Sequence, residues 1–149
     1  MLFSELPLTR RKANYSFKVS EKIMMGKKPK LLVVEDNRET QLLIKVALRK
    51  EYDVLIVNSA DEATVLLSKN HFELVLLDLN LNGQGNGKSI LKNIREIMHN
   101  TELPVIITTA YDLSLEDKKY FEEHANGFVQ KPFDNKILLN SIKQILVKN

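Results

Sequence analysis

Residues 73–80 read ELVLLDLN, a run of four apolar residues bounded by a glutamate and an aspartate. The run is continuous rather than alternating, which is typical of a strand covered on both faces. Similar runs rich in Val, Ile and Leu, the last of them weaker, occur at residues 31–34, 54–57, 105–107 and 128–129. These runs predict five short strands of a parallel sheet, the first four of them covered on both faces.

The segments between and after these strands carry apolar residues three or four positions apart, as in Leu42 with Val46 and within residues 138–145. This spacing places the apolar side chains on one stripe of a helix. Ser59 and Ser114, each followed by acidic residues, are typical helix N-caps. The alternation of strands and helices predicts an α/β fold, a doubly wound five-stranded parallel sheet with right-handed crossovers.

The composition indicates one globular domain without disulfides. The 149 residues are 44% hydrophobic and 28% charged, and there is no Cys. The lack of Cys excludes a disulfide framework, a thiolate nucleophile and a Cys-based metal site. No apolar run approaches the roughly 18 residues needed to span a bilayer, and basic residues 10–12 occupy the place of a signal peptide's apolar segment. We therefore expect a cytoplasmic protein.

The positive charge is concentrated near the N-terminus. Residues 1–30 hold eight of the 22 basic and two of the 19 acidic side chains, which leaves 14 basic and 17 acidic side chains in residues 31–149. A DNA-binding domain usually carries a basic face of its own, so this balance argues against direct nucleic-acid binding. Residues 1–29 also lack a sustained apolar period. We expect a basic tail or linker there, before a domain over residues 30–149.

Residues 1–29 have four open interpretations. In the first three interpretations the segment is a plain tail, the remnant of an inter-domain linker, or the product of an upstream start codon. In the last of these, Met24 or Met25 is the first residue of the domain. The fourth interpretation is an arm that binds a partner or a membrane surface, and it rests on charge alone.

Polar residues stand at the ends of four of the five predicted strands. Glu35 and Asp36 follow the first strand, Asp78 follows the third, Thr109 closes the fourth and Lys131 follows the fifth. Each has an ordinary structural explanation on its own, such as the N-cap of the next helix, which Asp36 or Asn37 could provide. In an open parallel sheet, however, the carboxyl ends of the strands form one ligand-binding edge. We therefore expect the five side chains to lie together.

The clustered carboxylates predict a cation site. Because carboxylates repel one another, such a cluster either raises a pKa or binds a cation. Mg²⁺ fits better than Ca²⁺, since one or two carboxylates plus waters are its usual ligands. A lysine and a threonine beside Mg²⁺ suit a phosphoryl group, because they neutralise its charge or donate hydrogen bonds to it. Asp78 is then the predicted nucleophile, and its product is an aspartyl phosphate.

Four stretches stand in order at these strand ends: LVVEDN at 32–37, LLDLN at 76–80, ITTA at 107–110 and GFVQKPF at 127–133. Together they resemble the receiver domain of bacterial two-component response regulators, over about residues 30–148. The resemblance implies a flavodoxin-like (βα)5 fold with strand order 2-1-3-4-5. The chain departs from the family's pattern in its glycine-rich loop up to Gly87, which lacks a proline that the family often has.

By this resemblance Asp78 accepts a phosphoryl group from the phosphohistidine of a sensor histidine kinase or a phosphotransfer protein. Asp36, Asp78 and the backbone carbonyl of Asn80 ligate Mg²⁺, and Glu35 acts mainly through a metal-bound water. No other cofactor is implied. The domain is expected to be regulatory rather than an enzyme for an external substrate, since it catalyses only its own phosphorylation and dephosphorylation.

The resemblance also implies a switch. Lys131 pairs with the phosphoryl oxygens, and its peptide bond to Pro132 is cis. Thr109 turns toward the phosphoryl group, and Phe128 follows inward. The fourth helix, fifth strand and fifth helix, about residues 114–148, form the face that binds a downstream protein. A phosphorylation-dependent homodimer is a further expected assembly.

Three alternatives stay open from the sequence. The chain is also consistent with a receiver module cut from a hybrid histidine kinase. A small Mg²⁺-dependent phosphatase would use the same acidic site on an external substrate. A receiver-like scaffold would keep the fold without being phosphorylated.

Overall fold

The computed structural model describes residues 17–81, 87–110 and 112–147. The strands are β1 (Lys30–Val34), β2 (Asp53–Val57), β3 (Leu74–Asp78), β4 (Val105–Thr109) and β5 (Gly127–Gln130). The helices that alternate with them are α2 (Arg38–Leu48), α3 (Ala60–Lys69), α4 (Gly87–Lys92) with its π-helical continuation η2 (Asn93–Ile97), α5 (Leu115–His124) and α6 (Asn135–Val147). All four strand pairs are parallel, and the strand order is β2-β1-β3-β4-β5, so the predicted fold is confirmed.

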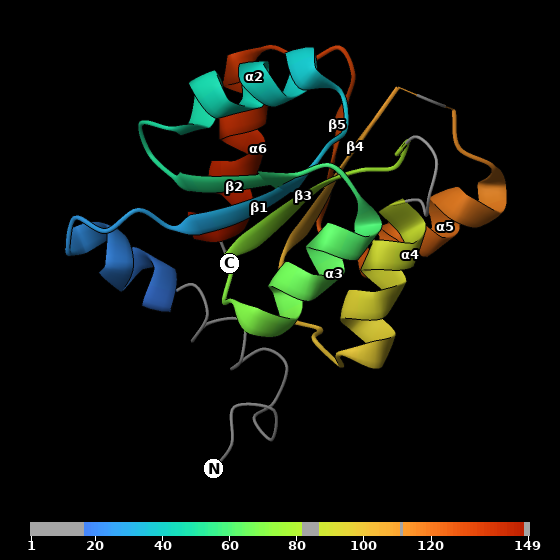
Figure 1. Cartoon of the computed structure of the whole chain (residues 1–149), viewed down its shortest axis with the longest axis horizontal. Coiled ribbons are helices and arrows are strands. Elements are labelled where there is room, and N and C mark those ends of the chain that lie inside the picture. Colours follow the sequence, from blue (N-terminus) through green and yellow to red (C-terminus); the bar gives the residue numbers. More distant parts are fainter. Residues whose placement is uncertain (1–16, 82–86, 111, 148–149) are drawn as a thin grey trace.

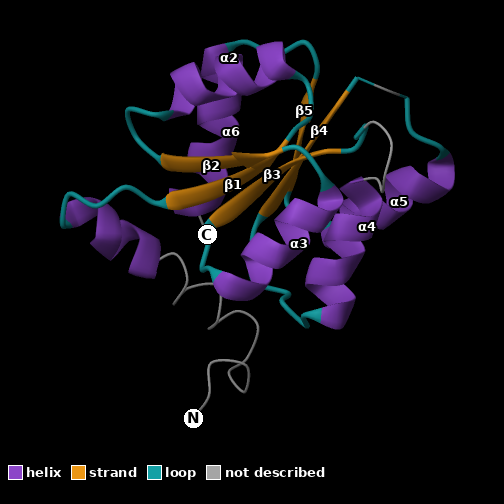
Figure 2. Cartoon of the chain, in the orientation of Figure 1, coloured by secondary structure: helices purple, strands orange, loops and turns teal. Residues whose placement is uncertain are grey.

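Helices cover both faces of the sheet, with α2 and α6 on one face and α3, α4 and α5 on the other (Figure 2). Successive residues of β1 contribute to the two cores in turn. Leu31 and Val33 pack in the core on the α2 and α6 side, and Leu32 and Val34 in the core on the α3 and α4 side. All four are fully buried. This two-sided burial explains why the run is apolar without alternation.

Strand β2 departs from the expectation of cover on both faces. Asp53 and Leu55 are exposed, while Val54 and Ile56 are half-buried. The strand lies at the edge of the sheet, beyond the helices that cover β1 and β3 on the α3 side. An apolar run at a sheet edge therefore does not require burial on both faces.

The face that α2 buries also differs from the prediction. Leu42 and Val46 are exposed, and Ile44 and Leu48 face the core instead. Apolar residues occur on nearly every side of this helix, so their spacing does not by itself select the buried stripe. In the last helix the prediction is correct, since Leu138 and Ile142 are buried.

Four of the described helices begin with side-chain caps, and in α6 the cap is Asp134 Oδ1, which accepts from the Ile137 N–H at 2.9 Å. The side chains of Ser59 and Ser114 accept hydrogen bonds from the backbone N–H groups three residues later, at 3.2 and 3.1 Å. Both caps were predicted from the sequence. Asn37, not Asp36, caps α2 by accepting from Thr40 N at 2.9 Å. Asp36 is therefore not engaged as the N-cap of this helix.

The segment before β1 contains a helix over residues 17–24, where the sequence shows no sustained apolar period. In Figure 1 it lies at the end of the sheet where β1 begins. Val19 of this helix is buried in the core on the α2 and α6 side. None of the helices in the described part of the chain is long and apolar enough to cross a membrane.

Candidate functional site

Three carboxyl groups meet beyond the ends of β1 and β3. Glu35 and Asp36 directly follow β1, and Asp78 is the last residue of β3. One carboxylate oxygen from each residue lies within 4.8 Å of the others. Glu35 and Asp78 are almost fully buried, and Asp36 is half-buried. Because β1 and β3 are adjacent and parallel, their ends bring the three groups to one place, as the sequence predicts.

Lys131, just after β5, joins two of these groups. Its Nζ lies 2.6 Å from Glu35 Oε2 and 3.2 Å from Asp78 Oδ2. Burial alone lowers the pKa of Lys131, but the hydrogen bond to Glu35 and the charge of Asp78 outweigh this effect and raise the pKa above its ordinary value. The ammonium group is therefore held in its charged form. The peptide bond from Lys131 to Pro132 is cis, as the resemblance implies.

The two buried carboxylates are held by the same kinds of partner. Burial raises the pKa of Glu35, and the hydrogen bonds from Lys131 and from the Asn37 N–H oppose that rise. The Asn37 N–H donates to Glu35 Oε1 at 3.0 Å. In the same way the Asn80 N–H donates to Asp78 Oδ1 at 3.0 Å. Each carboxylate thus has one oxygen held by the chain two residues later and one oxygen facing Lys131.

Gly87, the first residue of α4, brings that helix close to the end of β3. A Cβ at this position would lie 2.6 Å from the carbonyl oxygen of Asp78 and 2.8 Å from Leu79 Cα. No side chain fits between the two backbones, so glycine allows α4 to start directly beside Asp78. Of the glycine-rich loop before it, residues 82–86 lie outside the described part of the chain.

The donor set of the acidic cluster fits a hard divalent cation. Glu35, Asp36 and Asp78 offer carboxylate oxygens only, from positions close enough to share one ion. Oxygen ligands of this kind suit Mg²⁺, which keeps several waters and takes one or two carboxylates.

A family model described as the response regulator receiver domain matches residues 31–143 of the chain. The chain belongs to this family. A CheY-like receiver domain from Methanospirillum hungatei is 25% identical, with a TM-score of 0.73, and the match covers 80% of this chain and 94% of that chain. The receiver domain of Francisella response regulator 1452 is also 25% identical, with a TM-score of 0.70 and cover of 80% and 97%.

A third similar structure comes from a larger protein. It is the N-terminal domain of a response regulator, sensory box and GGDEF three-domain protein from Carboxydothermus hydrogenoformans. That domain is 28% identical to this chain, with a TM-score of 0.68, and the match covers 78% of this chain and 93% of that chain. The match of the family model leaves residues 1–30 of this chain outside the receiver-domain pattern.

Thr109 and Phe128 lie on neighbouring strands of the receiver domain, β4 and β5. Thr109 is almost buried, and its carbonyl oxygen accepts from the Lys131 N–H at 2.9 Å. Thr109 and Asn80 line a hollow of about 250 Å³. The Phe128 side chain is 43% exposed, and its ring centre lies 6.4 Å from that of Phe121 on α5. In this structure the Phe128 ring thus lies at the surface rather than in the core.

Gln41 is a receiver-domain residue at the site that the sequence analysis did not single out. Its Nε2 donates to the carbonyl oxygen of Glu35 and to Asn58 Oδ1, both at 2.6 Å. Gln41 therefore ties the turn after β1 to the turn after β2 and fixes the backbone that carries the first carboxylates. Gln41 lies inside a helix, away from any strand end and outside any motif spacing, so the sequence pattern does not predict its role at the site.

Proposed function

We propose that this receiver domain accepts a phosphoryl group on Asp78 from the phosphohistidine of a sensor histidine kinase or phosphotransfer protein. A carboxylate oxygen of Asp78 forms the bond to phosphorus while the P–N bond breaks, and the imidazole nitrogen leaves with the electron pair. The observation that carries the proposal is the Lys131 ammonium group 3.2 Å from Asp78 Oδ2. A positioned cation beside the acceptor stabilises the charge on the phosphoryl oxygens.

The acidic cluster supports a role for Mg²⁺ in this reaction. Asp36, Asp78 and the backbone carbonyl of Asn80 would hold the ion, and Glu35 would act mainly through a bound water. When bound, Mg²⁺ supplies positive charge that offsets the charge of the phosphoryl oxygens. Lys131 orients the acceptor, since it already contacts both Glu35 and Asp78.

Receiver domains are regulatory, and we propose that this one acts through a change of surface. Thr109 turns its hydroxyl toward the phosphoryl group, and Phe128 moves inward into the space that Thr109 leaves. The exposed position of the Phe128 ring supports this proposal, because inward movement would bury it. The affected face consists of α5, β5 and α6, and it binds a downstream protein or a second copy of the chain.

We further place the receiver domain in residues 30–149, with residues 1–29 as a basic tail or linker, and we place the protein in the cytoplasm. The domain catalyses only its own phosphorylation and dephosphorylation. The same chemistry holds for a stand-alone receiver and for a receiver module of a hybrid histidine kinase.

The decisive experiment is the intact mass of the protein after incubation with Mg²⁺ and acetyl phosphate. We expect a gain of one phosphoryl group in the wild type and none in Asp78→Asn. Asp61→Asn is the matched control, since it makes the same carboxylate-to-amide change at an exposed position in the first turn of α3. We expect it to gain the phosphoryl group like the wild type.

Two outcomes would contradict the proposal. No mass gain from acetyl phosphate or from a phosphorylated sensor kinase would indicate a scaffold that is no longer phosphorylated. Sustained hydrolysis of an external phosphate ester would instead indicate the small Mg²⁺-dependent phosphatase.

A further inference from the structure

The helix over residues 17–24 is anchored to the sheet by one apolar and one charged contact. Val19 is 2% exposed and packs in the core on the α2 and α6 side. Lys22 Nζ lies 2.8 Å from Glu73 Oε1, and the other oxygen of this buried carboxylate accepts from the Lys30 N–H at 2.5 Å. The segment ahead of β1 is thus held against the end of the sheet where the strands begin.

A tight turn closes this helix. The Gly26 N–H donates to the Ile23 carbonyl at 2.9 Å, and the Lys27 N–H donates to the Lys22 carbonyl at 3.0 Å. Gly26 has a φ of +72°, the left-handed conformation that this pair of bonds requires. The turn therefore presents the residues on both sides of Gly26 at the surface.

Large apolar side chains of this segment are exposed at that turn. Met24 is 88% exposed and Met25 is 65% exposed. Phe17, at the other end of the same helix, is 69% exposed. Long apolar side chains that project from the surface, rather than line a cavity, are suited to entering a soft apolar phase.

Basic side chains surround the same turn. A hollow of about 600 Å³ is lined by six of them, Lys22, Lys27, Lys28, Lys30, Lys45 and Arg49, with Asp53 as its single acidic side chain. These residues come from the N-terminal segment, from the start of β1 and from the C-terminal part of α2. Segments far apart in the sequence therefore build one cationic surface.

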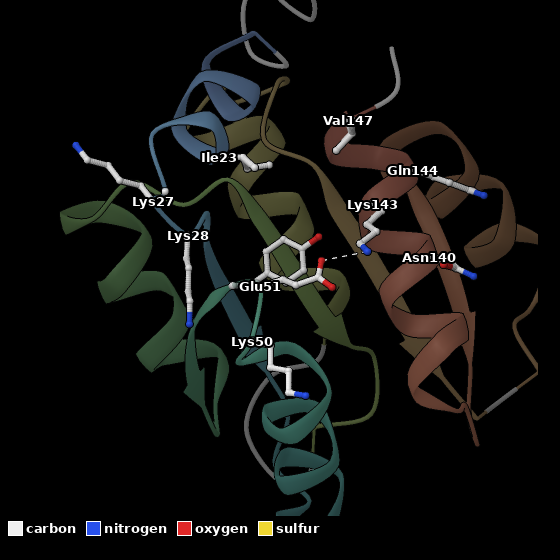
Figure 3. A pocket seen from close by; sticks show the side chains of 11 residues that line it. Ile23, Lys27, Lys28, Lys50, Glu51, Asn140, Lys143, Gln144 and Val147 are labelled. Carbon is white, nitrogen blue, oxygen red and sulfur yellow. Dashed lines mark ion pairs between the residues drawn. The ribbon is translucent and has the colours of Figure 1, made fainter.

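A second hollow of about 620 Å³ adjoins the first, with Lys27 and Lys28 shared between them. In Figure 3, Ile23 and Val147 stand on its two sides, and Lys27 and Lys28 extend away from α6. The ion pair between Lys143 and Glu51, at 3.2 Å, lies between these two sides. Apolar surface and outward-pointing ammonium groups thus occur side by side.

Several of these cations have no acidic partner. Lys22 pairs with Glu73, and Lys143 pairs with Glu51. Within the described ranges, Lys27, Lys45, Arg49 and Lys50 form no ion pair with a carboxylate, and all four are exposed. Among the residues that the structure describes, the surface around the Gly26 turn therefore has a net positive charge.

We propose that the surface around the Gly26 turn binds the face of an anionic lipid bilayer. Two features of the structure point to lipid. Unpaired lysine and arginine side chains suit a negatively charged headgroup layer. The projecting Met24 and Met25 side chains suit the boundary between headgroups and acyl chains.

This placement leaves the phosphorylation site accessible. The Gly26 turn lies where the strands begin, and Asp78 lies where β3 ends. A receiver domain bound to a membrane through this turn would present its acidic cluster away from the bilayer. Binding to lipid and phosphorylation of Asp78 should therefore be independent.

The test is co-sedimentation of the full chain with vesicles. We expect binding to vesicles of equimolar phosphatidylglycerol and phosphatidylcholine, decreasing with added salt, and no binding to phosphatidylcholine alone. The double variant Lys27→Glu/Lys50→Glu should bind at least about tenfold more weakly, since each basic residue near a charged membrane contributes about fivefold. Met24→Ser/Met25→Ser, which changes no charge, should also lose about tenfold.

The matched control is Lys118→Glu/Lys119→Glu on α5, which makes the same charge change at two exposed lysines away from the turn. We expect it to keep nearly wild-type binding, and far-ultraviolet circular dichroism should show that all variants are folded. The proposal is overturned if the wild type does not sediment with the anionic vesicles or if the α5 control loses as much binding as Lys27→Glu/Lys50→Glu. It is also overturned if binding to polyglutamate or RNA is as tight as to vesicles and the methionine variant has no effect.

Discussion

The two ends of the sheet use charge in opposite ways. Where the strands end, Glu35 and Asp78 are buried, and Lys131 lies between them at 2.6 and 3.2 Å. Where the strands begin, most of the cations around Gly26 are exposed, and several of them have no acidic partner among the described residues. Buried paired charges hold one geometry, whereas exposed unpaired charges attract a partner without ordering the protein.

The difference has a consequence for how the two ends should respond to mutation. Residues at the strand ends act together on one reaction, so a change there should mainly alter phosphorylation. Substitutions at the strand beginnings should alter the stability of the protein or its surface binding and leave phosphorylation unchanged. Substitutions at each end of the sheet test this separation.

The largest effect is expected for Lys131→Ala. Removal of the ammonium group takes away the cation beside Asp78, and the rate of phosphorylation by acetyl phosphate should fall by about 10²–10³-fold. The rate is measured from intact mass over time. Lys136→Ala, at an exposed lysine of α6, is the control and should leave the rate unchanged. An unchanged rate in Lys131→Ala would remove the central support for the proposed site.

Alanine substitutions at two glycines, one at each end of the sheet, allow a direct comparison of the two ends. Gly87→Ala places a Cβ 2.6 Å from the Asp78 carbonyl oxygen, which must shift the backbone beside the acceptor. We expect a loss of about 2–3 kcal/mol in the free energy of unfolding and slower phosphorylation. Gly26→Ala meets no atom within 4 Å but must keep a φ of +72°. We expect it to cost only about 1 kcal/mol and to leave phosphorylation unchanged.

Urea unfolding and the phosphorylation rate of both glycine variants provide the measurement. Equal loss of phosphorylation in the two variants would show that the two ends of the receiver domain are coupled. Such a result would contradict the separation of the two ends.

Glu73→Ala should destabilise the protein by about 1–2 kcal/mol, because it removes the carboxylate that binds Lys22 Nζ and the Lys30 N–H. The change is at the beginning of β3, far along the strand from Asp78. We therefore expect normal phosphorylation together with a lower urea midpoint. Glu62→Ala, at an exposed position on α3, serves as the control for removal of a carboxylate and should cost less.

The last effect appears only at alkaline pH and concerns Tyr52, whose pKa is raised by burial from 10.0 to about 12. In the unfolded chain the hydroxyl ionises near its ordinary pKa, so its contribution to stability is complete below pH 10 and is lost as the pH rises toward 12. Between these pH values the wild type should lose about 2 kcal/mol more than Tyr52→Phe. Urea unfolding at a series of alkaline pH values measures this, and parallel losses in the two proteins would contradict it.

Local sequence signals predicted the features that depend on neighbouring residues. Ser59 and Ser114 cap their helices because a hydroxyl reaches a backbone N–H three residues later whatever the rest of the fold does. Asp78 follows a continuous apolar run, and parallel strands necessarily bring their ends to one edge. The clustering of the acidic residues could therefore be predicted from the sequence alone.

Other features depend on how elements approach one another. The exposed face of Leu42 and Val46 follows from the way α2 packs on the sheet, because its sequence offers apolar residues on several sides. Arg95, in η2, donates to the carbonyl oxygens of His124, Asn100 and Leu103 at 2.8–2.9 Å. No local pattern in the sequence indicates that one arginine joins the loop before β4 to the end of α5.

The sequence by itself determined the parallel sheet, its order by resemblance, and the residues that stand at its strand ends. The sheet and the strand-end residues follow from periodicity and from chain direction, which short stretches contain in full, whereas the strand order follows only from the family resemblance. Only the tertiary structure decided that residues 17–24 form a helix against the sheet, and that lysines from three segments surround the Gly26 turn. This surface depends on packing between segments far apart in the chain. The buried Val19 and the ion pair of Lys22 with the buried Glu73 hold the N-terminal helix against the sheet.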